Sequence, residues 1–284
     1  MIRLALRVRR EDAEVALAEL LELAPSGVEE RELDGGAVIE YAVYGAPGEL
    51  PALPDLRAAA GGALVEVVTE EIPDDWHERW KAFHRPVDVP PGSRGGVGLR
   101  VRPPWEPALD TPGQAVEELV IDPGQAFGTG AHHTTRLCLE LLLELEPGGA
   151  CVDVGCGSGV LAIAASRLGW SPVVGVDHEA ESVAATGENA HANGVAVEAR
   201  GFDLLFDGPA PGAPTVLANL LRPLLLTVAR TGFAGGVVPD ALIASGLLAE
   251  EADEVAAAFA ATMGLRESDR RHGGEWAALL LRRA

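Results

Sequence analysis

Apolar positions recur with two different periods along the first seventy residues. From residue 2 to residue 8 every second position is apolar, which is the period of a half-buried strand. Residues 11–23 instead carry apolar side chains at helical spacing and end before a proline and a glycine. Two short strands flank a hairpin signal at residues 33–36, and a short helix and another strand complete the order β-α-β-β-α-β. This order predicts a small α+β, ferredoxin-like domain over residues 1–70, which has no chemical motif and is interpreted as a substrate-recognition domain.

A linking helix is predicted over residues 71–86. Trp76, Trp80 and Phe83 fall on one face at helical spacing. Such a stripe is typical of a helix that packs on a neighbouring domain. The alternative is a hinge whose aromatic side chains also face a substrate.

The remaining residues, 87–284, have the pattern of an α/β domain. Strands separated by proline-rich turns are predicted over residues 87–122, and after residue 131 amphipathic helical stretches alternate with short runs rich in valine and alanine. Because these runs are apolar at successive positions, they predict parallel strands buried on both faces, as in a doubly wound sheet. The last run, residues 275–283, has no helix after it and fits an antiparallel end strand.

The composition restricts the partners that such a protein can bind. The 43 acidic and 22 basic residues give a formal net charge of −21, which disfavours nucleic acid and anionic membranes and favours a basic partner. The alternative is that the charge serves solubility alone. The three cysteines lack C-x-x-C spacing, so reduced thiols in a cytoplasmic protein are expected. The first ten residues lack the apolar core of a signal peptide, and no apolar run approaches the roughly 18 residues of a membrane helix.

A glycine-rich loop follows the first strand of the repeated α/β pattern. Residues 153–160, DVGCGSGV, place Gly155 and Gly157 between a strand and a helix, where the missing Cβ lets the backbone approach a ligand. Asp177 ends the next apolar run, 22 residues after Gly155, and a carboxylate there can accept hydrogen bonds from both hydroxyls of a ribose. A helix cap is the alternative role for this residue. Up to this point NAD and S-adenosylmethionine fit the pattern equally well.

Two features favour S-adenosylmethionine over NAD. Asp153 comes two residues before Gly155, where it would face the pyrophosphate of a dinucleotide. S-adenosylmethionine carries no phosphate, and its ammonium group tolerates a nearby carboxylate. Asn219 ends a later apolar run, and an Asn at such a strand end can accept hydrogen bonds from a target amine. A capping role is the alternative for Asn219.

A second glycine-rich loop, residues 122–134, reads DPGQAFGTGAHHT. It lacks the G-K-[ST] of a phosphate-binding loop. His132 and His133 have no Cys or carboxylate at metal-ligand spacing, so no metal site is expected. We expect this loop to cover the first glycine loop and Thr134 to offer its hydroxyl to the cofactor. The alternative is that Thr134 and Thr135 only cap the helix that follows.

Five motifs occur in a distinctive order, namely DPGQAFGTGAHHTT (122–135), DVGCGSGVLAIAA (153–165), GVDHEAESVAATGENAHANGV (175–195), ANLL (218–221) and SGLL (245–248). In this order they resemble the bacterial ribosomal protein L11 methyltransferase family, PrmA. The upstream stretch EEIPDDWHERWKAF (70–83) and the last strand resemble the same family. The resemblance is close over residues 65–284 and holds only in pattern before them. Its most specific part is the phrase D-P-G-x-A-F-G-T-G.

The resemblance implies a class I, seven-stranded methyltransferase domain, S-adenosylmethionine as methyl donor, and an N-terminal module that recognises a ribosomal protein. The family's cofactor positions correspond to Thr134, Gly155, Asp177 and Asn219, and the glycine loop adds Gly157. No catalytic residue is identified.

Four positions depart from the usual sequence of the family. They are Gln125 in place of Leu, Ala131 in place of Thr, His133 in place of Pro, and Arg222 in place of a small residue. None of them removes a cofactor position, so they bear on substrate preference and not on the class of reaction.

These observations together predict N-methylation of lysine side chains or an α-amine of a basic, large-subunit ribosomal protein by a cytoplasmic monomer. The rival within the class is a lysine methyltransferase that acts on another protein. Rivals from other classes are an NAD-dependent oxidoreductase and a module that binds a nucleoside without catalysis. Binding of S-adenosylmethionine against NAD tests the oxidoreductase, and methyl transfer to a cell lysate tests the binding module.

Overall fold

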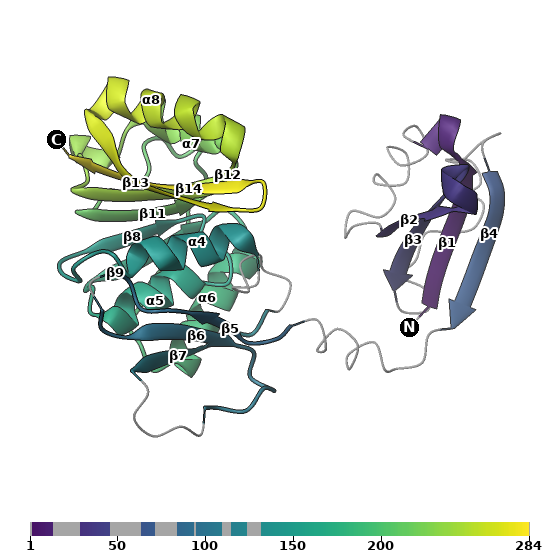
Figure 1. Cartoon of the computed structure of the whole chain (residues 1–284), viewed down its shortest axis with the longest axis horizontal. Coiled ribbons are helices and arrows are strands. Elements are labelled where there is room, and N and C mark those ends of the chain that lie inside the picture. The colour runs from purple at the N-terminus through teal and green to yellow at the C-terminus, as the bar shows by residue number, and fades with distance from the viewer. Residues whose placement is uncertain are drawn as a thin grey trace. The chain divides into compact units, whose positions relative to one another are not determined.

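The computed structural model describes residues 2–13, 29–45, 64–71, 84–93, 95–109, 115–123 and 132–283. The chain divides into two compact units, residues 1–83 and 84–284 (Figure 1). Three predicted helices lie outside the described residues for most of their length, namely the helix over 11–23, the short helix before the fourth strand and the linking helix over 71–86.

The first unit contains a four-stranded antiparallel sheet. Its elements are β1 (Ile2–Arg9), η1 (Arg10–Asp12), β2 (Glu29–Leu33), η2 (Asp34–Gly36), β3 (Val38–Gly45) and β4 (Leu64–Glu71). In space the strands follow the order β2-β3-β1-β4, so the first strand lies between the third and the last. This order confirms the strand pattern predicted for a ferredoxin-like unit.

Side chains alternate across β1 as its period predicts. Leu4 and Leu6 are buried on one face. On the other face Arg3 and Arg7 donate hydrogen bonds to the carboxylate of Glu40 in β3, at 2.6 and 2.8 Å. Burial alone would raise the pKa of the Glu40 carboxyl, but the two guanidinium groups hold it below its usual value. This ion cluster therefore ties the two neighbouring strands together.

The second unit is built on a seven-stranded sheet. Its strands are β8 (Cys151–Val154), β9 (Val173–Asp177), β10 (Glu198–Gly201), β11 (Thr215–Asn219), β12 (Ala241–Leu248), β13 (Leu265–Gly273) and β14 (Trp276–Arg283). Their order is β10-β9-β8-β11-β12-β14-β13, and β8 to β12 are parallel. The order reverses between β8 and β11, and ligands of such sheets bind beside this point, at the carboxyl ends of the strands. The sheet confirms the predicted class I α/β fold.

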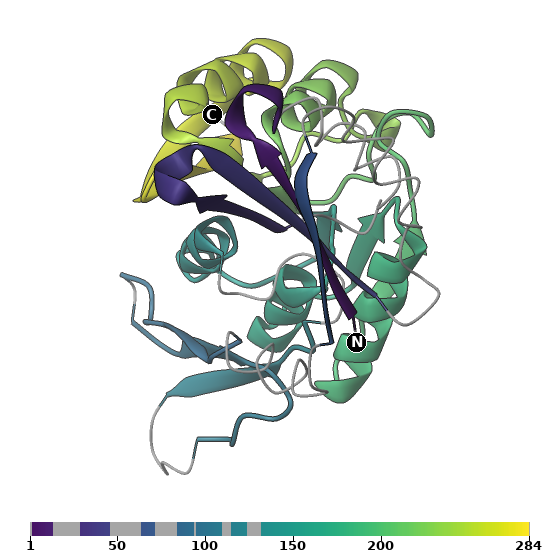
Figure 2. The ribbon, with the colours of Figure 1, turned by 90° about the vertical axis from the view of Figure 1, so that its right-hand side faces the viewer.

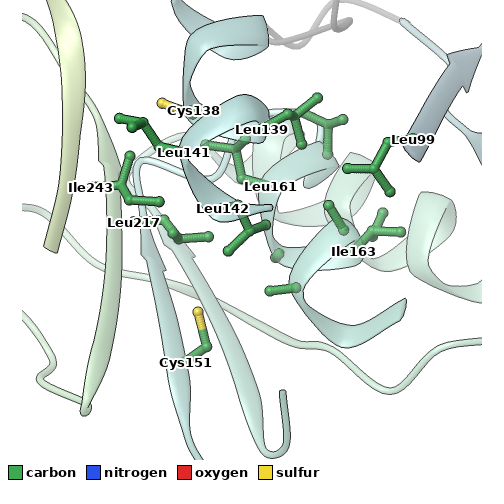
Figure 3. Close-up of a cluster of buried hydrophobic side chains, with 14 of the residues drawn as sticks. Leu99, Cys138, Leu139, Leu141, Leu142, Cys151, Leu161, Ile163, Leu217 and Ile243 are labelled. Atoms are coloured by element: carbon green, nitrogen blue, oxygen red, sulfur yellow. The ribbon is translucent and has the colours of Figure 1, made fainter. Parts of the chain in front are cut away.

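Helices cover both faces of this sheet (Figures 1 and 2). They are α4 (His133–Leu142), α5 (Val160–Leu168), α6 (Ala180–Ala192), α7 (Arg222–Thr231) and α8 (Ala252–Met263), with short 3-10 turns at η4 (Ala234–Gly236) and η5 (Ala249–Glu251). Leu217 and Ile243 pack with α4 and α5 in one apolar cluster (Figure 3), whereas their neighbours Val216 and Leu242 pack with α7 and α8 in another. Successive residues of a strand point to opposite faces, so strands covered on both sides need apolar residues throughout.

A smaller, three-stranded sheet joins the cluster around α4 and α5. It consists of β5 (Val87–Val89), β6 (Gly98–Arg102) and β7 (Val116–Val120), in the region where strands and proline-rich turns are predicted. Leu99 of β6 and Leu119 of β7 are buried in this cluster. Figure 3 shows Leu99 pointing toward the helices of the cluster.

The terminal strand differs from the prediction in its position. β14 is antiparallel to its neighbours, as predicted, but it lies between β12 and β13 and not at the end of the sheet. The end position belongs to β13, whose sequence, LRESDRRHG, contains one buried residue, Leu265. An edge strand tolerates charged side chains because much of its surface meets water, so the hydrophobic pattern does not reveal it.

A side chain of α6 connects the two glycine-rich loops. Asn189 is 3% exposed, and its side-chain oxygen accepts a hydrogen bond from the N–H of Asp122 at 2.9 Å. Its side-chain nitrogen donates to the carbonyl oxygen of Ser158, also at 2.9 Å. The start of the second loop is thereby held against the end of the first.

Replacing Asn189 with Ala should lower the free energy of unfolding by about 1–3 kcal/mol, because the buried carbonyl of Ser158 loses its donor. His191→Ala is the matched control, since His191 is an exposed residue of the same helix. Urea denaturation of the full chain measures both variants. Equal losses in the two variants would contradict a clamping role for Asn189.

Candidate active site

A cavity of about 470 Å³ lies at the carboxyl ends of β8, β9 and β11. The five residues that the sequence assigns to cofactor binding all line it, namely Thr134, Gly155, Gly157, Asp177 and Asn219. They come from separate segments that meet where the strand order reverses. Residues 124–131 of the second glycine-rich loop lie outside the described residues, so their place over the first loop stays a prediction.

The path of the first glycine loop depends on the absence of side chains. Gly155 has a φ of +75°, and a Cβ at this position would lie 2.4 Å from Cδ2 of Leu220. Gly157 also has a positive φ, of 52°. The loop therefore presents its backbone to the cavity, and the positive φ at both positions favours glycine over other residues.

The carboxylate of Asp177 is held from two sides. Oδ2 accepts a hydrogen bond from the N–H of Gly157 at 3.0 Å, and Oδ1 accepts one from the N–H of Glu179 at 3.1 Å. The second bond closes a turn just before α6, whose N-cap is Glu179, so Asp177 is not the helix cap that the sequence leaves open. Because a carboxylate has about four acceptor sites, Asp177 retains capacity for ligand hydroxyls at the cavity wall.

Asp153 lies beneath the glycine loop and not on the cavity wall. It is 1% exposed, and Oδ2 accepts a hydrogen bond from the N–H of Ala162 at 3.1 Å, in the first turn of α5. Oδ1 is buried, and none of the residues that the structure describes forms a hydrogen bond with it. Burial raises the pKa of this carboxyl to about 7, and the charge of Asp177 adds to the rise. Asp153 therefore supports the N-terminus of α5, and its place near the amino-acid end of a cofactor stays a prediction.

The opposite wall is formed by the start of α4. The helix is capped by His132, whose Nδ1 lies 3.4 Å from the N–H of Thr134 and 2.8 Å from its Oγ1. The cap is therefore His132. The alternative interpretation of the sequence, in which Thr134 and Thr135 cap the helix, is wrong. Burial, together with the neighbouring His133, lowers the pKa of His132. Its ring meets the indole of Trp276 edge-on, with centroids 5.1 Å apart.

Asn219 brings a buried acceptor to the cavity. Its Nδ2 donates to Oγ1 of Thr135 at 3.4 Å. Its Oδ1 is buried and has no hydrogen-bond partner among the described residues. Buried polar atoms are rarely left unpaired, so an orphaned acceptor on a cavity wall indicates a ligand that donates a hydrogen bond.

Several wall residues are not assigned to the site from the sequence, among them His132 and Trp276. The sequence pattern argues against a metal role for His132 and places Trp276 only in the last strand, yet both line the cavity. Nothing in the pattern around Trp276 signals this role.

A smaller cavity of about 170 Å³ shares Gly155 and Asp177 and adds Asp203, which follows β10. The sequence signal that could have indicated Asp203 is an acidic residue just beyond a third parallel strand.

Two further properties concern only the described parts of the chain. They contain no group of three or more His, Cys, Asp or Glu side chains arranged to hold a metal ion. Their helices include none that combines the length and the apolar character needed to cross a membrane.

Comparison with known proteins gives concordant matches. Residues 55–284 match the model of the family described as ribosomal protein L11 methyltransferase (PrmA). A ribosomal protein L11 methyltransferase of Geobacter metallireducens is 40% identical over 227 residues, which cover 78% of this chain and 70% of the relative. One of Pseudomonas putida strain W619 is 42% identical over 214 residues, covering 74% and 70%. The crystal structure of a ribosomal protein L11 methylase from Lactobacillus delbrueckii subsp. bulgaricus superimposes with a TM-score of 0.56 at 29% identity, covering 66% of this chain and 95% of that one.

The raised pKa of Asp153 makes a prediction about stability. An unfolded Asp ionises near ~3.9, whereas the folded carboxyl keeps its proton to about pH 7. Between these values the folded state holds a proton that the unfolded state has lost. The free energy of unfolding of the wild type should therefore fall as pH rises from about 4 to 7, by at most about 1.4 kcal/mol per pH unit from this group.

The variant Asp153→Asn lacks this contribution and should gain stability relative to the wild type over the same pH range. Urea denaturation at several pH values measures the difference. Asp240→Asn is the control, because the Asp240 side chain is 70% exposed. Parallel pH curves for the wild type and Asp153→Asn would show that the buried carboxyl is ionised in the folded protein.

Proposed function

The chain belongs to the ribosomal protein L11 methyltransferase (PrmA) family, and on this premise we propose that it transfers methyl groups from S-adenosylmethionine to amino groups of ribosomal protein L11. The observation that carries the proposal is the orphaned, buried Oδ1 of Asn219 in the cavity that Asp177 and the glycine loop also line. An amine N–H is the donor that this acceptor lacks.

The residues of the cavity fit S-adenosylmethionine. A volume of about 470 Å³ lies within the usual range of small-molecule sites. Asp177 offers acceptors for the two ribose hydroxyls, and Gly155 and Gly157 leave space and backbone groups for the amino-acid portion. Thr134 adds a hydroxyl on the opposite wall. When bound, this cofactor supplies an electrophilic methyl group on a sulfonium.

Asn219 orients the substrate amine in this proposal. An N–H of the amine donates to Oδ1, while the bond from Nδ2 to Thr135 fixes the plane of the amide. Held in this way, the amine keeps its lone pair free to attack along one direction, and such positioning supplies much of the rate. Positive charge develops on the amine nitrogen, and the preorganised amide oxygen stabilises it.

Apolar side chains on the cavity wall favour the neutral form of the amine. A free lysine has a pKa near ~10.4 and an α-amine one near ~7.7–8.0, so the lysine is mostly protonated at neutral pH. Leu220, Leu221 and Trp276 line the cavity, and an apolar environment disfavours the charged ammonium. These apolar side chains lower the cost of deprotonating a lysine that enters the site, whereas the carboxylates of Asp177 and Glu179 on the same wall act in the opposite direction.

The rest of the chain suits a basic protein substrate. A net charge of −21 attracts basic proteins over long range. We assign recognition of the substrate to the N-terminal unit, since residues 1–70 carry no chemical motif. We further propose that the protein acts as a monomer in the cytoplasm, where ribosomal proteins are made.

The test is incubation of the purified chain with ribosomal proteins and labelled S-adenosylmethionine, followed by mass spectrometry of the labelled protein. Label on ribosomal protein L11, at lysines or at the α-amine, is the expected result. Label confined to other proteins would support the rival lysine methyltransferase, and binding of NAD without methyl transfer would support an oxidoreductase. A parallel reaction with residues 84–284 alone tests the N-terminal unit, since transfer at the full rate would remove its recognition role.

Asp177→Ala should weaken binding of S-adenosylmethionine about ten- to a hundredfold, because two charge-assisted hydrogen bonds to the ribose are lost. Titration calorimetry measures the affinity. Asp177→Asn keeps one acceptor for the N–H of Gly157 or Glu179 and should lose less. Wild-type affinity in a folded Asp177→Ala protein would rule out the ribose assignment.

Asn219→Ala should reduce kcat about a hundredfold or more, because the amine loses the acceptor that orients it and stabilises its developing charge. Affinity for S-adenosylmethionine should fall less than in Asp177→Ala. Single-turnover transfer and calorimetry on the same preparation separate the two effects. If kcat stays at the wild-type level, the amine is held by another group.

A further inference from the structure

Large apolar side chains lie exposed at the carboxyl edge of the seven-stranded sheet. Leu205 is 63% exposed and Phe206 is 85% exposed, both in the turn after β10. Leu221, the residue before α7, is 65% exposed. Exposed apolar clusters of this kind mark interaction sites more often than isolated apolar residues do.

These side chains adjoin the candidate active site. Leu221 lines the main cavity, and Leu205 lines the smaller one beside it. Leu224, in the first turn of α7, lines both cavities and therefore connects the apolar surface at Leu221 with that at Leu205. The apolar surface is thus continuous with the place where the amine is proposed to enter.

The turn that carries Phe206 is held in a defined shape. The N–H of Asp203 donates to Oδ2 of Asp207 at 2.8 Å, and the N–H of Leu205 donates to Oδ1 of Asp203 at 2.8 Å. The N–H groups of Phe206 and Asp207 also donate to the carbonyl oxygen of Asp203. A turn closed by this many hydrogen bonds presents the phenyl ring to solvent without further ordering, which reduces the entropy lost on binding.

The charges around the apolar surface are negative. Asp203 and Asp207 flank the exposed pair, and Glu179 lies exposed on the wall of the main cavity. Arg222 follows Leu221, but it is paired with Glu251 at 3.1 Å and Glu254 at 2.7 Å. A partner that meets this surface therefore has to combine apolar contact with positive charge.

We propose that Leu205, Phe206 and Leu221 form a docking rim for the protein substrate, which binds an apolar side chain beside the methylated amine in a basic segment. The inference rests on the proposed function and extends it from the amine to the residues around it. Within the rim, Leu205 and Phe206 add affinity for the protein substrate from outside the main cavity, whereas Leu221 also lines that cavity.

The experiment compares Phe206→Ser and Leu221→Ser with the wild type in the full chain. Val237→Ser is the matched control, because Val237 is 39% exposed but lies in the connection between α7 and β12, at the opposite edge of the sheet. The readouts are kcat and KM for ribosomal protein L11 at saturating S-adenosylmethionine, the Kd of that cofactor by calorimetry, and molar mass by light scattering.

The expected result is a KM for ribosomal protein L11 raised about tenfold or more in Phe206→Ser, because a buried phenyl ring is lost from the complex. The increase should be smaller in Leu221→Ser and absent in Val237→Ser, with the cofactor Kd unchanged in Phe206→Ser.

A wild-type KM in Phe206→Ser, in an enzyme that methylates ribosomal protein L11, overturns the docking rim alone. A dimeric wild type that becomes monomeric in Phe206→Ser with unchanged KM assigns the surface to self-association and also overturns it. Failure of the wild type to methylate ribosomal protein L11 overturns the proposed function, and the inference with it.

Discussion

Close packing of three loops around Leu220 is the constraint on which the site depends. A Cβ at Gly155 would lie 2.4 Å from the Leu220 side chain, and a Cβ at Gly246 would lie 2.5 Å from its carbonyl oxygen. The N–H of Leu220 also donates to the carbonyl oxygen of Ser245 at 2.9 Å. The carboxyl ends of β8, β11 and β12 are thereby locked together, and Asn219, the residue before Leu220, is held at the cavity wall. A side chain at position 246 would collide with the backbone of Leu220, and the positive φ of Gly155 disfavours other residues there.

The two acids of this region have different environments and therefore different tasks. Asp177 lines the cavity and accepts hydrogen bonds from two backbone N–H groups. Asp153 is enclosed beneath the loop, and burial raises its pKa to about 7. A protonated carboxyl there supports the start of α5 without placing a second full negative charge near Asp177. Of these two acids, only Asp177 therefore offers its carboxylate to a ligand in the cavity.

Separate parts of the second unit carry out the separate tasks of the proposed reaction. The orphaned oxygen of Asn219 meets the amine, and the glycine loop with Asp177 holds the cofactor. The proposed docking rim, Leu205, Phe206 and Leu221, runs from the wall of the main cavity to the exposed turn after β10 and contacts the protein around the amine. Such a division allows a protein substrate to gain affinity from surface that plays no part in the chemistry, which is the usual source of selectivity in large interfaces.

The sequence by itself determined the class of fold and predicted five of the residues that line the cavity. Valine- and alanine-rich runs separated by amphipathic stretches require a parallel sheet covered on both faces, and glycine, Asp177 and Asn219 at strand ends indicate a site at its carboxyl edge. Only the tertiary structure decided that β14 lies inside the sheet, that Asp153 is buried beneath the glycine loop and that His132 meets Trp276 edge-on at the cavity wall. The reason is physical. Periodicity reports which side of an element is buried, because burial acts locally along the chain, whereas the contacts of His132 and Trp276 join residues far apart in sequence and depend on how whole elements pack.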